Sequence, residues 1–129
     1  MKYSRFEELP VWKDAIELAV RIFALTAKPY FRGHSGLRNQ LENATVSISN
    51  NTAEGFERGT TQELLTFIYI ARGSSGEVRS MLCLLERLPG SGDFKSEISD
   101  LKLRAEGLAR NYEPGPTRCK TRTSGASAI

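Results

Sequence analysis

Apolar residues recur every three or four positions along four stretches of the chain, and this spacing limits the possible folds more than any other feature. It places apolar side chains on one face of an α-helix. The stretches span residues 10–27, 35–56, 61–88 and 94–112, and proline and glycine residues separate them. Since the sequence contains neither the alternation typical of strands nor an internal repeat, we predict an all-α fold.

The short connections between these stretches favour neighbouring helices that run in opposite directions. We therefore predict an antiparallel, up-down-up-down four-helix bundle in residues 1–112. The chain has 129 residues, 40% of them hydrophobic, which suits one domain with a single core. Residues 113–129 are rich in Pro, Ser, Thr and Gly and have almost no apolar content, so we predict a disordered tail there.

The third stretch has a recognisable start and an unusual middle. Thr60 or Thr61 can cap it, and if Thr60 is the cap, Glu63 has the spacing of a capping box. Gly73 and Gly76 lie mid-helix, where each costs about 1 kcal/mol relative to Ala, so we expect a neighbouring helix to pack closely over them. At the start of the fourth stretch, Asp93 is the candidate N-cap.

The first and third helices each carry two apolar stripes, although a bundle helix needs a single inward face. On the first helix these are Trp12, Ala15, Ile16, Ala19 and Phe23, and beside them Val11, Leu18, Ile22 and Leu25. On the third they are Leu64, Ile68, Ala71, Ser75, Val78, Leu82 and Leu85, and beside them Phe67, Ile70, Ser74, Glu77, Met81, Leu84 and Leu88. One interpretation is a wide core-facing stripe; we favour the other, in which the second stripe lies in the interface of a homo-oligomer.

The charge is weakly basic and concentrated in the tail. The formal net charge is +3, of which residues 1–112 contribute +1 and residues 113–129 contribute +2. Basic residues on the helices are either a solvated, ion-paired face or a phosphate-binding surface for RNA or DNA. The candidate nucleic-acid-binding residues are Arg21, Arg38, Arg58, Arg79, Arg87, Lys102, Arg104 and Arg110.

The residue types needed for catalysis or metal binding are scarce. His34 is the single histidine and lies in a turn, so a di-metal or zinc site and a Ser/His/Asp triad are not expected. The two cysteines, Cys83 and Cys119, form no disulfide framework, and we expect Cys83 to be a buried core thiol. We therefore expect no enzyme activity and no cofactor.

Targeting segments are also not expected. The N-terminus lacks the apolar stretch of a signal peptide, and no apolar run approaches the roughly 20 residues of a membrane span. We expect a cytoplasmic protein.

Four polar residues, Asn50, Asn51, Glu54 and Glu77, fall near the apolar stripes. They either make hydrogen bonds between helices or subunits, or they form a ligand site. We favour the structural role because buried polar groups are usually satisfied by such bonds. An enzyme that uses Glu54 and Glu77 is the least favoured alternative.

Three motifs resemble those of a known family. Residues 6–15, FEELPVWKDA, are similar to its F-x-x-L-x-V-W-x-x-A opening. Residues 36–40, 47–48 and 51–56 resemble its second-helix signature, and residues 69–74 with Glu77 resemble its third. The family is that of the small bacterial four-helix bundle proteins often called ribosomal-RNA intervening-sequence proteins.

The resemblance implies a four-helix bundle that assembles as a ring-like homopentamer. It also implies that the chain is related to the accessory variability determinant of diversity-generating retroelements. That protein resembles a basic partner of a reverse transcriptase and its template RNA. Asn51, Glu54, Arg72 and Glu77 stand at signature positions and are interpreted as structural or interface residues. The resulting hypothesis is a non-enzymatic oligomeric adaptor that binds structured RNA, with a purely structural scaffold as the alternative.

Overall fold

The computed structural model describes residues 3–112 as a set of helices, with no strand in that range. The long helices are α1 (Pro10–Thr26), α2 (Ser35–Glu57), α3 (Thr61–Arg87) and α4 (Lys95–Asn111). Short 3-10 helices precede or join them: η1 (Phe6–Glu8), η2 (Pro29–Gly33) and η3 (Ser91–Phe94). The prediction of an all-α chain with four helices is confirmed, and the predicted tail, residues 113–129, lies outside the described residues.

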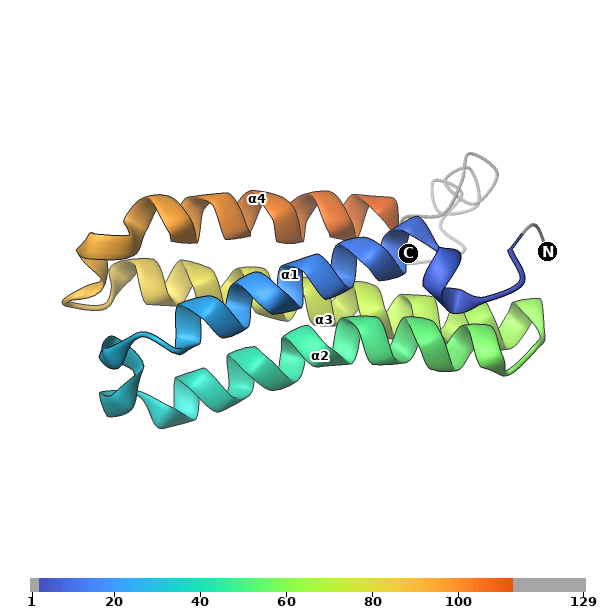
Figure 1. Ribbon diagram of the computed structural model, residues 1–129, viewed down its shortest axis with the longest axis horizontal. Coiled ribbons are helices and arrows are strands. Elements are labelled where there is room, and N and C mark those ends of the chain that lie inside the picture. Colours follow the sequence, from blue (N-terminus) through green and yellow to red (C-terminus); the bar gives the residue numbers. More distant parts are fainter. Residues whose placement is uncertain (1–2, 113–129) are drawn as a thin grey trace, which may run out of the picture.

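The four helices lie side by side, and the chain turns back at each connection (Figure 1). α1 packs on α2 and α4, and α3 packs on the same two helices. The connections that contain η2 and η3 therefore lie together at one end (Figure 1). The N-terminal segment and the α2–α3 turn lie at the other end, where residues 3–4 and 59–61 line one depression.

The core follows the helical spacing of the sequence. The predicted seam of α4 is buried from Ile98 to Leu108, and the stripe of α1 that contains Leu18 and Ile22 faces it. Beside this stripe, Phe23 is 44% exposed and Val20 is 61% exposed, whereas Ala15, which shares a stripe with Phe23, is buried. The core of one protomer thus uses the stripe of Leu18 and Ile22 together with Ala15, and it leaves Val20 and Phe23 outside.

Helix α2 buries several hydroxyl groups in a segment with weak helix propensity. The hydroxyls of Thr45 and Thr52 donate to the carbonyls of Leu41 and Ile48, at 2.7 and 2.8 Å. Hydrogen bonds to the preceding turn satisfy hydroxyls that would otherwise be costly to bury. Among the described residues, no buried side-chain nitrogen or oxygen lacks a partner.

The close helix approach in this fold occurs at Gly55, at the end of α2. A β-carbon built at Gly55 would lie 2.6 Å from the β-carbon of Phe67 on α3. The expected packing over Gly73 and Gly76 is wrong, because a β-carbon at either would meet no atom within 4 Å. Both glycines are exposed on the outer face of α3.

The helix starts give one correct and one wrong prediction. The Glu63 amide donates to the Thr60 hydroxyl at 3.2 Å, so Thr60 caps α3 as predicted. Asp93 does not cap α4, because η3 continues to Phe94 and α4 begins at Lys95.

Cys83 contradicts the expectation of a buried thiol. Its side chain is exposed on the outer face of α3. The neighbouring Leu82 occupies the buried position of that turn. None of the helices in residues 3–112 is long and apolar enough to cross a membrane.

Candidate nucleic-acid interface

Five of the eight predicted nucleic-acid-binding residues are held in ion pairs. Four of them pair with a carboxylate four residues earlier in the chain, and Lys102 on α4 reaches Glu86 on α3 at 2.9 Å. A hydrogen bond from Lys102 to Glu86 raises the pKa of that amine. The four pairs at this spacing are Arg21–Glu17, Arg58–Glu54, Arg104–Asp100 and Arg110–Glu106. A phosphate would have to compete with these carboxylates for the cations.

The other three, Arg38, Arg79 and Arg87, make no ion pair with another described residue. Arg38 is half-buried in the first turn of α2, while the other two are exposed on the second half of α3. The eight residues therefore do not form a single patch, and the structure separates paired from unpaired cations.

Within residues 3–112, three further unpaired cations do not belong to the eight: Lys13 on α1, Arg32 in η2 and Lys95, the first residue of α4, all of them exposed. Arg32 and Lys95 lie at the η2/η3 end. The signal was available in the chain, because residues 27–38 and 87–95 together contain five cations and one carboxylate. It is recognisable once the two segments are known to meet at one end of the helices.

An aromatic cluster joins these two segments. The ring of Tyr30 lies 5.2 Å from that of Phe94, and its hydroxyl donates to the Pro89 carbonyl at 3.0 Å. On its other side Tyr30 stacks on His34, with 4.6 Å between ring centroids. Gly90 adopts a φ of 87°, which is accessible to glycine and lets the chain pass close to Tyr30. The cluster fixes the position of η2 relative to η3.

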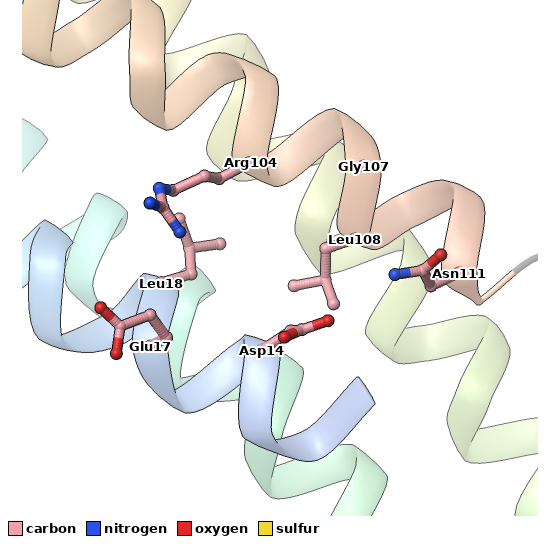
Figure 2. Close-up of a pocket in the computed structure, with 7 residues that line it drawn as sticks. All are labelled: Asp14, Glu17, Leu18, Arg104, Gly107, Leu108 and Asn111. Carbon is pink, nitrogen blue, oxygen red and sulfur yellow. The ribbon is translucent and has the colours of Figure 1, made fainter. Parts of the chain in front are cut away.

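The groove between α1 and α4 forms a cavity of about 230 Å³ (Figure 2). α1 contributes Asp14, Glu17 and Leu18. From α4 come Arg104, Gly107, Leu108 and Asn111. Glu17 and Arg104 are each paired to a residue of their own helix, at 3.0 Å. The cavity holds no histidine or cysteine, so its lining offers carboxylates without the nucleophile and oriented base of a hydrolytic site.

No group of three or more His, Cys, Asp or Glu residues that could hold a metal ion occurs in the described part of the chain. His34 stacks on Tyr30 and is half-buried beside η2, far along the chain from either carboxylate of the cavity.

A sequence model of the 23S rRNA-intervening sequence protein family matches residues 7–111. The chain belongs to this family. The match covers all four long helices and both the η2 and η3 connections. A comparison with curated proteins finds no match.

The four signature residues, Asn51, Glu54, Arg72 and Glu77, lie on α2 and α3. They do not form one site. The Asn51 amide donates to the carbonyl and the hydroxyl of Ser47, at 2.8 and 2.9 Å, and that hydroxyl is 2.9 Å from the Ser74 hydroxyl on α3. Asn51 thus supports a polar bridge between the helices. Glu54 is exposed and pairs with Arg58, Arg72 is half-buried, and Glu77 is exposed beside a shallow groove between α2 and α3.

Proposed function

We propose that this protein is a non-enzymatic, homo-oligomeric adaptor that binds nucleic acid, with structured RNA as the favoured ligand. The observation that carries the proposal is membership of a family described by an intervening sequence of 23S rRNA. The proposal is also supported by surface cations that have no carboxylate partner and are therefore free to contact phosphate.

The assembly proposed is an antiparallel up-down-up-down bundle that forms a ring of identical subunits, with a pentamer favoured. It is supported by the apolar residues left outside the core of one protomer: Val20 and Phe23 on α1, and Ile70 and Leu84 on α3. Their exposed fractions run from 44% to 61%, and Val20 and Phe23 are neighbours on one face of α1. A ring multiplies each phosphate contact by the number of copies.

A protein partner is a further part of the proposal. The resemblance to the accessory variability determinant of diversity-generating retroelements makes a reverse transcriptase the candidate. We also propose a cytoplasmic location, since both RNA and such a partner are found there in bacteria.

The test is binding of the purified full chain to a structured RNA and to a DNA duplex of equal length, near physiological salt. We expect the RNA to bind at least as tightly as the duplex. Tighter binding of the duplex would reassign the ligand to DNA. No binding of either would favour the alternative function, a structural scaffold for protein partners.

A further inference from the structure

The helical body is electrically polarised along its length although its overall charge is small. The segments at the η2/η3 end, residues 27–38 and 87–97, hold five cations and two carboxylates, a formal net charge of +3. The segments at the opposite end, residues 3–14, 54–63 and 106–112, hold four cations and seven carboxylates, a net charge of −3. A net count over the whole body conceals this separation.

Ion pairing increases the contrast between the ends. In residues 3–112, six cations have no ion pair or other interaction recorded, and four of these six are at the η2/η3 end. These four are Arg32, Arg38, Arg87 and Lys95. At the opposite end, Arg5, Arg58 and Arg110 each contact a carboxylate.

The same end is also well ordered by contacts between its two connections. Tyr30 bonds to Pro89 and packs on Phe94, and Lys28 reaches Glu97 on α4 at 3.5 Å. Arg32 is thereby fixed relative to Lys95, because the first lies in η2 and the second directly follows Phe94. The contacts therefore fix the backbone positions from which these two side chains extend.

Helix geometry adds to the attraction for anions at this end. Both α2 and α4 begin there, and neither His34 nor Phe94, at the two N-cap positions, makes a side-chain hydrogen bond to the first turn. Unsatisfied amides at helix N-termini favour phosphate, although α1 and α3 end nearby and oppose this effect.

We propose that the η2/η3 end is the surface that contacts the phosphate backbone of RNA, through Arg32, Arg38, Arg87 and Lys95. This inference rests on the proposed nucleic-acid-binding function. It assigns phosphate binding to one end of the molecule and no longer to cations scattered over α1, α2 and α4. Among the described residues, the opposite end has an excess of carboxylates, so it attracts the backbone less than the η2/η3 end does. The half-buried ring of His34, stacked on Tyr30, borders this surface.

The test compares two variants of the full chain that lose the same charge. The first is R32Q/R38Q/R87Q/K95Q, and its matched control is R21Q/R58Q/R104Q/R110Q, which removes four paired cations elsewhere. A double variant, R32Q/K95Q, changes only exposed residues and keeps the test valid if the quadruple variant folds poorly. Each variant is measured against structured RNA over a salt series, with circular dichroism as the check on folding.

We expect the first variant to lose roughly tenfold or more in RNA affinity, and its salt slope to fall by about three, since each phosphate contact contributes about 0.7–0.9 to the slope. The control should stay within about threefold of the wild type. Equal losses in both variants, or an unchanged first variant, would overturn the assignment of this surface while RNA binding itself still stands.

Two other results would also contradict the inference. Failure of the wild type to bind RNA would remove the proposed function and the surface together. Competition by polyglutamate as effective as that by unlabelled RNA would indicate that the end recognises an acidic protein.

Discussion

The hydroxyl of Tyr112 lies 2.5 Å from the hydroxyl of Thr52, and this contact ties the residue after α4 to the second half of α2. Thr52 donates its own proton to the Ile48 carbonyl at 2.8 Å, so the Tyr112 hydroxyl acts as the donor between the two side chains. Burial raises the pKa of Tyr112 to about 12, against a smaller opposing effect of the Thr52 hydrogen bond.

This contact predicts a loss of stability at high pH. Unfolded tyrosine ionises near pH 10, whereas Tyr112 in the folded chain stays neutral until about pH 12. The stability that neutral, buried Tyr112 contributes is therefore complete below pH 10. As the pH rises toward 12, the free energy of unfolding falls by on the order of 2–3 kcal/mol. Urea unfolding at a series of pH values from 8 to 11.5 measures this decline.

Tyr112→Phe is the control for that experiment. The variant should lose about 1 kcal/mol at pH 8, because Thr52 loses its hydrogen-bond donor. Its free energy of unfolding should then decline less steeply than that of the wild type above pH 10. An identical decline in both proteins would show that Tyr112 is not the titrating group.

Two glycines should respond to alanine with opposite signs. Gly55→Ala forces a β-carbon against Phe67, which should lower the free energy of unfolding by roughly 1–3 kcal/mol. Gly76→Ala meets open space in α3 and should raise it by about 1 kcal/mol through helix propensity. Chemical denaturation of both variants tests the pair, and destabilisation by Gly76→Ala would contradict the packing described for α3.

These two positions show what the sequence could and could not predict. Apolar spacing was enough to locate all four helices, and the Thr60–Glu63 spacing was enough to locate the start of α3. The spacing describes one helix at a time, so it could not indicate which neighbour approaches a given glycine. The prediction therefore placed the close approach at Gly73 and Gly76, whereas the structure has it at Gly55.

The candidate interface was limited by the same lack of tertiary information. The sequence identified Arg38 and Arg87 as candidates, but it ranked them with Arg21 and Arg104, whose carboxylate partners lie one helical turn away. Arg32 and Lys95 did not enter the candidate set because their proximity depends on the packing of η2 against η3. The exposure of Cys83 was missed because an apolar stretch does not specify which face of α3 points outward.

The exposed stripe of α1 provides a test of assembly. The double variant V20E/F23E places charge on side chains that are 61% and 44% exposed in one protomer. If this stripe lies between subunits, the variant should dissociate to the 14.3 kDa protomer, because burying unpaired carboxylates is costly. Sedimentation velocity at micromolar concentration distinguishes the two states.

Leu103→Glu is the matched control for assembly, since Leu103 is 67% exposed but lies on α4, whereas Val20 and Phe23 lie on α1. It should leave the oligomer intact. A wild-type chain that already sediments as a single protomer would contradict the proposed oligomer, and the exposed stripe of α1 would then need another explanation.

The most direct test of the central claim is the affinity of the wild-type full chain for a structured RNA as a function of salt concentration. We expect binding that weakens steeply with salt, with a slope of about three or more in a double-logarithmic plot, because the four unpaired cations at the η2/η3 end of one protomer contact phosphates. Absence of binding near physiological salt, or binding that does not change with salt, would contradict it.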